Sequence, residues 1–507
     1  MDLKAELVML KNAVANVMRG GAAALVAILL PPFLTRYMRP DAFGTWCLVL
    51  QVSAYVGYLD FGIQTAVGRF VAHDNERGEA NYGDGIVSTA LAALSTLGVL
   101  GIVASVPVAL RLSNIFPQMP PALAGDARLA LLLVAASLAV GLPASVFNGV
   151  FVGLQRNEVP AAIIGGSRIF SAVLLVLVAH RGGPLVQMGA TVAAVNLGTY
   201  LLQYFIYRKL VPGSRPSVQL ISRKAGRELF DYCLSLCVWS FAMLLVTGLD
   251  LALVGHFQFE AVAYYAVAAS LIAFLTGLQN AVFGVMIPST AVLHVRGDTR
   301  ELGRVMITAT RYGAFLLLLT GLPLILAATN ILTMWVGPTY GAHGQRILQV
   351  LVAANMIRLS AVAYVMTLIG TGDQRLVTFT PTLEGISNLL VSVVGGYLFG
   401  AIGVAVGTLI GALVGVGGNF LYNMRRTTGM VFRISDYLID GLLRPGICAL
   451  PLVIYVTLMN LSNLPDTLVR HLFLAVVLLA TGFLLWRWGL VDAERERLRS
   501  WRLALQV

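Results

Sequence analysis

Residues 128–151 read RLALLLVAASLAVGLPASVFNGVF, an apolar run whose one charge, Arg128, stands at its start. A helix rises about 1.5 Å per residue, so a run of this length crosses the roughly 30 Å hydrocarbon core of a bilayer. Similar runs fill nearly the whole chain, so we expect an all-α polytopic membrane protein. Apolar length and flanking breaks indicate about fourteen such segments, at residues 14–37, 43–65, 84–110, 128–151, 160–180, 185–207, 230–255, 263–287, 305–329, 347–369, 377–399, 401–424, 437–460 and 468–489.

The composition leaves no room for a soluble catalytic domain. Of the 507 residues, 58% are hydrophobic and 12% are charged, and the mean hydropathy is +0.82. Soluble globular proteins carry about 25% charged residues. The sequence contains no phosphate-binding loop of an ATPase, no zinc-protease motif and no nucleophile elbow. We therefore expect no enzyme activity and no catalytic residue.

The cysteines do not indicate a metal centre. All four lie in predicted spans, and no cluster of histidines or carboxylates completes a metal site around them. Free cysteines of this kind usually pack as small hydrophobic residues. They are Cys47, Cys233, Cys237 and Cys448.

The net charge is +11, and the distribution of the basic residues indicates a membrane topology rather than a nucleic-acid site. If the N-terminus is cytoplasmic, about two thirds of the lysines and arginines fall on the cytoplasmic side, as the positive-inside rule expects. An even number of spans then places both termini in the cytoplasm. The densest basic cluster lies between the sixth and seventh spans, where it would contact anionic lipid headgroups. It comprises Arg208, Lys209, Arg215, Arg223, Lys224 and Arg227.

The chain repeats itself weakly. Residues 41–46 (DAFGTW) open the second span and residues 260–265 (EAVAYY) open the eighth, an offset of 219 residues. The same offset aligns residues 77–79 (RGE) with residues 296–298 (RGD). Six spans per half is an even number, so both halves run in the same sense. This arrangement predicts a parallel repeat around an axis along the membrane normal, a common plan for transporters.

The repeat divides the chain into four predicted parts. We expect a six-helix N-terminal lobe at 1–210, a basic cytoplasmic linker at 211–228 and a six-helix C-terminal lobe at 229–426. Residues 427–507 then form two additional helices and a basic cytoplasmic tail. Within the second lobe, glycines recur every four residues and make one smooth helix face, which predicts either close helix packing or a face that slides during transport. These are Gly403, Gly407, Gly411 and Gly415.

Charged residues inside spans are costly and are functional candidates by default. Arg358 lies roughly 18 Å into its span, and Arg168 and Glu384 lie roughly 12–13 Å from the cytoplasmic side. These three are too deep for their side chains to reach the headgroups easily. Arg19 and Arg311 are nearer to the ends of their spans, where headgroup contact is the alternative.

Buried arginines suit an anionic substrate. The guanidinium fork is permanently charged and binds phosphate oxygens bidentately. We expect a central cavity that binds an anion such as a lipid pyrophosphate. The alternative is internal pairing, for example of Arg358 with Glu384, because buried charges are usually paired. The candidate substrate-binding residues are Arg168, Arg358, Arg19, Glu384 and Asn355.

The signals for energy coupling are weaker. The candidates for coupling or gating are Asp60, Asp250 and Arg311, and the carboxylates could carry H⁺ or Na⁺. Both aspartates lie close to helix ends, so helix caps or salt-bridge partners are the alternative roles. Beyond such an ion, no cofactor is expected.

Several segments resemble a known family. They are residues 34–38 (LTRYM) followed by 41–44 (DAFG), residues 58–63 (YLDFGI) running into 68–72 (GRFVA), and residues 249–255 (LDLALVG). These segments are similar to those of Wzx-type polysaccharide-export flippases of the multidrug/oligosaccharidyl-lipid/polysaccharide (MOP) superfamily.

The resemblance implies a MATE-like fold, with two six-helix lobes around a central cavity, in a bacterial inner membrane. It implies alternating access that moves an undecaprenyl-pyrophosphate-linked oligosaccharide repeat unit to the periplasmic leaflet, for O-antigen or exopolysaccharide synthesis. The expected partners are this substrate, membrane lipids and, as a candidate, a polysaccharide polymerase. Nucleic acid is not an expected partner, and the protein is expected to be a monomer.

Three alternatives stay open. An ion-coupled multidrug exporter and a lipid II flippase would share the fold. Buried arginines outnumber buried acids in mid-membrane, which favours an anionic substrate over a cationic drug. A membrane enzyme that joins lipid-linked sugars would need a large external loop with catalytic groups, and the sequence has none.

Overall fold

The computed structural model describes residues 3–77, 80–213, 216–284, 286–462, 468–490 and 495, which form helices and turns but no strand. The first half contains α1 (Leu3–Tyr37), α2 (Pro40–Ala54), η1 (Tyr55–Asp60), α3 (Ile63–Arg77), α4 (Ala80–Leu110), α5 (Leu112–Ile115), α6 (Pro121–Gly153), α7 (Glu158–His180) and α8 (Leu185–Leu210). The linker contains η2 (Val218–Leu220).

The second half continues with α9 (Arg223–Met243), η3 (Leu244–Gly248), α10 (Asp250–Phe257), η4 (Phe259–Ala261), α11 (Val262–Phe283), α12 (Met286–Val295), α13 (Thr299–Leu326), α14 (Ala328–Val336), α15 (Pro338–Leu359), α16 (Val362–Thr371), α17 (Gln374–Gly418), η5 (Asn419–Asn423) and α18 (Met424–Arg426). The last part contains α19 (Ile434–Asp436), η6 (Tyr437–Leu443), α20 (Arg444–Ser462), α21 (Leu468–Leu484) and η7 (Leu485–Gly489).

The prediction of an all-α polytopic membrane protein is confirmed, but the number of spans differs. By length and composition, 11 segments of the described chain can cross a membrane, or up to 12 with a pair of helices bent by 43° at residues 223–248. This is fewer than the about fourteen expected. One reason is that α17 contains two antiparallel arms, because Gly400, with a φ of 60°, turns the chain back. Another reason is that α21 is only 17 residues long.

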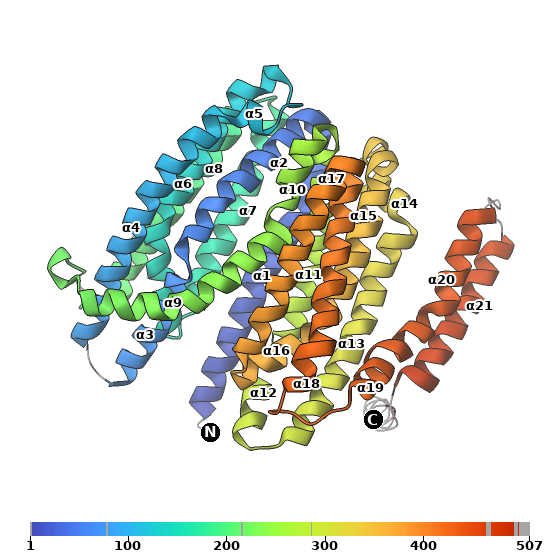
Figure 1. Cartoon of the computed structure of the whole chain (residues 1–507). Coiled ribbons are helices and arrows are strands. Elements are labelled where there is room, and N and C mark those ends of the chain that lie inside the picture. Colours follow the sequence, from blue (N-terminus) through green and yellow to red (C-terminus); the bar gives the residue numbers. More distant parts are fainter. Residues whose placement is uncertain are drawn as a thin grey trace, which may run out of the picture.

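The helices form two lobes and a separate helix pair (Figure 1). The N lobe contains α1 to α8, and the C lobe contains α10 to α18. Beyond the C lobe, α20 and α21 lie side by side, and α20 packs on α13. The start of α1 and the end of α21 lie on the same side of the molecule (Figure 1).

Among the residues that the structure describes, the apolar core shared by the two lobes lies at one end. At the upper end in Figure 1, Leu34 and Trp46 of the N lobe pack in one cluster with Val262 and Tyr265 of the C lobe. At the opposite end, one cluster contains N-lobe helices and the start of α9, and another contains C-lobe residues and the adjoining segment up to Tyr437. We call the shared end the joined end and the opposite end the split end. Two bodies joined at one end suit a rocking motion.

Residues related by the repeat meet at the joined end. Gly44 and Ala263 differ by the 219-residue offset of the two halves. A Cβ atom at Gly44 would lie 3.1 Å from the backbone nitrogen of Ala263. In a two-fold arrangement, a residue touches its own equivalent only at the axis. The contact therefore supports a parallel repeat whose axis passes between α2 and α11.

Each lobe contains a helix break. In the N lobe, α2 passes into the 3₁₀ turn η1, which is followed by Phe61 and Gly62 with left-handed φ angles of 48° and 82°. In the C lobe, α9 passes into the π-helical turn η3 before α10 begins at Asp250. The predicted seventh span at 230–255 is therefore interrupted.

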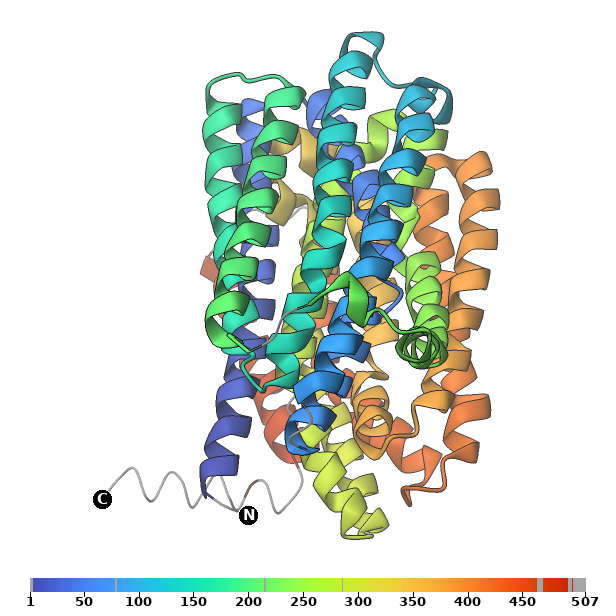
Figure 2. The same cartoon turned by 90° about the vertical axis from the view of Figure 1, so that its left-hand side faces the viewer.

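The first part of this interrupted segment links the lobes. In Figure 1, α9 lies across the lower part of the molecule, and in Figure 2 it is viewed almost along its axis. It contacts α3 and α4 of the N lobe and α17 of the C lobe. Leu229 and Cys233 of α9 belong to the apolar cluster of the N lobe. The first part of α9 therefore packs with the N lobe, and the chain passes to the C lobe within α9 rather than at the linker.

Candidate functional site

A stripe of buried polar side chains runs along the first arm of α17. It recurs every four residues and comprises Thr380, Glu384, Asn388 and Ser392. The glycine face of the second arm packs on this stripe, and a Cβ atom at Gly411 would lie 2.8 Å from the Cβ of Asn388. Because glycine has no side chain, the two arms approach closely enough to bury the polar groups. Of the two interpretations of the glycine face, the contacts bear out close packing.

Asp250, at the start of α10, meets this stripe and is 8% exposed. Its Oδ2 accepts hydrogen bonds from Thr408 Oγ1 at 2.9 Å and from the Tyr265 hydroxyl at 3.3 Å. Asn388 lies within hydrogen-bonding reach of the same carboxylate. Ser392 Oγ donates to Asn388 Oδ1 at 2.8 Å and is 3.2 Å from a backbone carbonyl of α17. We call this group the Asp250 cluster; its members are Asp250, Asn388, Ser392, Thr408 and the carbonyl of Val404.

The chemistry of the Asp250 cluster suits a small hard cation. One carboxylate, two hydroxyls, an amide and a backbone carbonyl are oxygen ligands of the kind that such cations prefer. Interrupted helices in transporters commonly supply such groups. Among the described residues, no three side chains of His, Cys, Asp or Glu gather as a transition-metal site would require.

Arg358 and Glu384 form a buried ion pair beside this cluster. Arg358 Nε lies 2.5 Å from Glu384 Oε1, and the side chains are 18% and 9% exposed. Arg358 Nη1 donates to Asn355 Oδ1 at 3.0 Å, whereas Nη2 is buried with no hydrogen-bond partner among the described residues. The guanidinium also interacts electrostatically with Asp250. The structure thus brings together three of the five predicted substrate-binding residues, in the paired form that was the alternative interpretation.

The other two predicted substrate-binding residues belong to the N lobe. Arg168 lies on α7 and is exposed. Arg19 lies on α1, and its side chain is outside the described part of the structure.

The remaining coupling candidates also lie apart from Asp250. Asp60 ends η1, and its Oδ1 accepts a hydrogen bond from Ser145 Oγ at 3.1 Å. Arg311, on α13, is only 3% exposed, so its side chain does not extend to the surface. Its guanidinium carbon is 5.8 Å from the centre of the Tyr312 ring, within the range of a cation–π contact.

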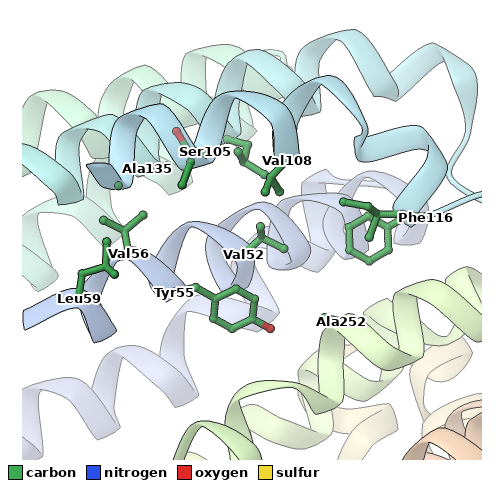
Figure 3. A pocket seen from close by; sticks show the side chains of 13 residues that line it. Val52, Tyr55, Val56, Leu59, Ser105, Val108, Phe116, Ala135 and Ala252 are labelled. Atoms are coloured by element: carbon green, nitrogen blue, oxygen red, sulfur yellow. The ribbon is translucent and has the colours of Figure 1, made fainter. Parts of the chain in front are cut away.

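An apolar groove of about 380 Å³ lies between the N lobe and α10 (Figure 3). Residues of α2, η1, α4 and α6 line most of it, and Ala252 lines it from the C lobe. Two hydroxyls reach its wall, and both are engaged within the protein. Tyr55 donates to the carbonyl of Gly248 and Ser105 donates to that of Ile102, each at 2.7 Å. None of the predicted site residues lines this groove.

Sequence reasoning missed the two hydroxyl-bearing members of the Asp250 cluster. Ser392 and Thr408 carry no charge, and small hydroxyls are common in membrane helices, where they usually bond their own backbone. The available signal was the four-residue spacing of polar residues in the first arm of α17, opposite the glycines of the second arm. That spacing predicts a shared face only once the two arms are known to form a hairpin.

Comparison with known proteins places this geometry in a family. The model of a family described as polysaccharide biosynthesis protein matches residues 9–294, which is more than half of the chain. A curated relative is the uncharacterized membrane protein EpsK of Bacillus subtilis (strain 168), which is 24% identical over 338 residues. That match covers 65% of this chain, and the chain spans 65% of the length of this relative.

Solved structures show the same fold. The lipid II flippase MurJ in an inward closed conformation superposes with a TM-score of 0.71 at 13% identity, over 94% of this chain and 98% of that one. An inward-facing multidrug resistance MATE family transporter of the MOP superfamily superposes with a TM-score of 0.60 at 16% identity, over 82% and 94%. These neighbours are a flippase and a transporter, not enzymes. The chain therefore belongs to the polysaccharide biosynthesis protein family, as a multi-pass membrane protein that shares the fold of these two proteins.

Proposed function

We propose that this protein flips a lipid-linked oligosaccharide repeat unit, carried on undecaprenyl pyrophosphate, across the bacterial inner membrane. The observation that carries the proposal is the division of the molecule into two lobes that share a core at the joined end and have separate cores at the split end. Such a body can open to one side of the membrane at a time. Membership in a polysaccharide biosynthesis family supports a glycan as the cargo.

The charge distribution supports the direction of transport. The basic linker after α8 adjoins the split end, because its Ser222 nitrogen and Ser217 nitrogen bond to Thr89 and Ser88 near the start of α4. Positive loops favour the cytoplasmic side. We therefore assign the split end and both termini to the cytoplasm, where the lipid-linked unit would enter. A polymerase partner and a monomeric state stay predictions.

Arg358 supports an anionic headgroup. Its guanidinium is paired with Glu384, yet Nη2 keeps an unused donor among the described residues. A pyrophosphate offers stronger bidentate acceptors than a single carboxylate. We expect the substrate to compete with Glu384 for Arg358 when the lobes move, and Arg168 to contribute from the N lobe.

The proposed function is tested by deleting the gene and locating the lipid-linked repeat units. The expected result is their accumulation on the cytoplasmic face, with loss of the surface glycan. Normal glycan combined with altered drug sensitivity would instead support a multidrug exporter. Rescue of cells depleted of their lipid II flippase would support the lipid II alternative. The variants Arg358→Ala and Arg168→Ala should insert normally and fail to restore export, with Arg181→Ala, an exposed arginine on the loop after α7, as the control.

We propose the Asp250 cluster as the site of a coupling cation, Na⁺ or H⁺. Its support is a buried carboxylate beside a helix break, which accepts a hydrogen bond from Thr408, together with the neighbouring oxygens of Ser392, Asn388 and Val404, which are hydrogen-bonded to one another. Export measured in inverted vesicles should respond to a Na⁺ or pH gradient, and Asp250→Asn should abolish that response. Asp60→Asn, which changes the carboxylate of the N-lobe break, is the matched control. If both variants lose the response to the gradient equally, the result contradicts a coupling role specific to Asp250.

A further inference from the structure

The helix breaks of the two lobes touch each other. We infer that Gln51 and Tyr55 of the N lobe are positioning residues for the Asp250 cluster of the C lobe, because they hold the turn that precedes Asp250. The inference rests on the proposed coupling role of that cluster. It assigns to two neutral side chains the link between closure of the joined end and cation binding.

The contact from the N lobe is specific. Gln51 Nε2 donates to the carbonyl of Gly248 at 2.8 Å, and the Tyr55 hydroxyl donates to the same oxygen at 2.7 Å. Gly248 is the last residue of the π-helical turn η3. A carbonyl at a helix break lacks its usual partner within the helix and must be satisfied from elsewhere. Here both of its hydrogen bonds come from the opposite lobe.

The same turn is held from the C lobe by a member of the Asp250 cluster. Asn388 Nδ2 donates to the carbonyls of Val246 at 2.8 Å and Leu245 at 3.3 Å. The turn η3 is therefore fixed on one side by the N lobe and on the other by the cluster. π-Helical turns are rare and often mark functional sites, because they reposition the residues that follow them.

The consequence is a thermodynamic link between closure of the joined end and cation binding at the Asp250 cluster. Asp250 begins α10 two residues after Gly248, so release of that carbonyl frees the backbone that aims the carboxylate at Thr408. If the cluster is complete only while Gln51 and Tyr55 are engaged, a cation binds more tightly when the joined end is closed. By reciprocity, the bound cation then stabilises the closed joined end by the same factor.

A simpler interpretation is that Gln51 and Tyr55 merely add to the contact between the lobes. The chain offers a control for it. Gln118 also bonds across the lobes at the joined end, where its side chain accepts from the Phe259 nitrogen at 3.0 Å and donates to the Phe257 carbonyl at 3.4 Å. It does not touch η3. Loss of Gln118 therefore weakens the joined end without changing the support of the turn.

The test measures the dependence of thermal stability on Na⁺, with K⁺ at equal ionic strength as reference and a pH series for H⁺. The full-length protein in detergent is compared as wild type, Asp250→Asn, Gln118→Leu and the double variant Gln51→Leu/Tyr55→Phe. We expect the double variant to need about tenfold more cation for half of the effect, within the usual range of coupling between sites. Gln118→Leu should keep the wild-type midpoint.

Each outcome bears on the inference. An unchanged midpoint in the double variant overturns it while leaving the coupling role of Asp250 intact, and an equal shift in Gln118→Leu overturns it as a general effect of lobe opening. If the wild type does not respond to Na⁺ or pH, the proposed coupling role fails. In that case a second measurement tests the link between Asp250 and the joined end. Spin labels are attached at Ala122→Cys and Thr339→Cys, at the joined end, and the distance between them is measured. Asp250→Asn and the double variant must both alter that distance distribution, and failure of either to do so rejects the link.

Discussion

The pair of Arg358 and Glu384 is the clearest charge feature of the molecule at the scale of single residues. Removing one partner of a buried ion pair leaves an uncompensated charge and typically costs about 3–5 kcal/mol. We therefore expect Arg358→Ala and Glu384→Ala each to lower the melting temperature of the purified protein. The double variant should regain most of this stability, because neither charge remains.

Export separates the structural role of the pair from its role in transport. If Arg358 binds the anionic headgroup, the double variant stays unable to export even though it is stable. Accumulation of lipid-linked units in cells that carry each variant provides the measurement. Normal export by a stable double variant would reduce the pair to a packing feature.

These residues also mark how far sequence reasoning reaches. The cost of charge in a membrane singled out Arg358, Glu384 and Asp250, and the structure places all three in one polar region. Whether Arg358 faced a cavity or a carboxylate depended on the relative positions of α15 and α17, which lie outside what spacing along one helix can predict. Ser392 and Thr408 were missed because they are neutral, although Thr408 donates a hydrogen bond to Asp250 and Ser392 donates one to the neighbouring Asn388.

At the scale of elements, the hairpin of α17 combines a polar stripe with a glycine face. A Cβ atom at Gly411 would lie 2.8 Å from Asn388 Cβ and 3.3 Å from its Cα, so the arms must move apart to admit it. Gly417 lies on the same arm and has nothing within 4 Å of such an atom. Gly411→Ala is therefore expected to destabilise by about 1–3 kcal/mol, the range for overpacking. Gly417→Ala should leave the melting temperature equal or slightly higher, because alanine favours helices; equal destabilisation by both would reject close packing as the reason for the glycines.

The helix breaks show the limit of prediction for elements. Apolar length predicts a span but not its continuity, and residues 230–255 were predicted to form one span. The structure interrupts this segment at η3, where Asn388, Gln51 and Tyr55 satisfy the freed carbonyls. Those partners come from distant parts of the chain, so no local signal identifies the break. Gly62 is different, since glycine directly after an aspartate and an aromatic residue is compatible with the left-handed turn that ends η1.

For the whole molecule, the fold was within reach of the sequence because the bilayer imposes it. Long apolar helices are one of the few structures that satisfy backbone groups in lipid, and the 219-residue offset indicated two equivalent lobes. The contact of Gly44 with Ala263 agrees with that offset. The sequence could not predict which end of the lobes is closed, because closure depends on how the two lobes pack against each other.

Closure of the joined end makes a prediction for the transport cycle. A flippase that rocks must open this end, so a covalent link across it should stop export. In a background without native cysteines, Gln118→Cys and Phe257→Cys, which lie in contact across the lobes, can be joined by a flexible, reducible thiol cross-linker. Ser113→Cys and Arg128→Cys provide the matched control at the same end, since their side chains are 3.0 Å apart within the N lobe. We expect only the cross-lobe link to stop export, and reduction to restore it, because the link between lobes blocks the motion whereas the link within one lobe moves with it. Undiminished export by the cross-linked protein would mean that the lobes do not separate at this end during transport.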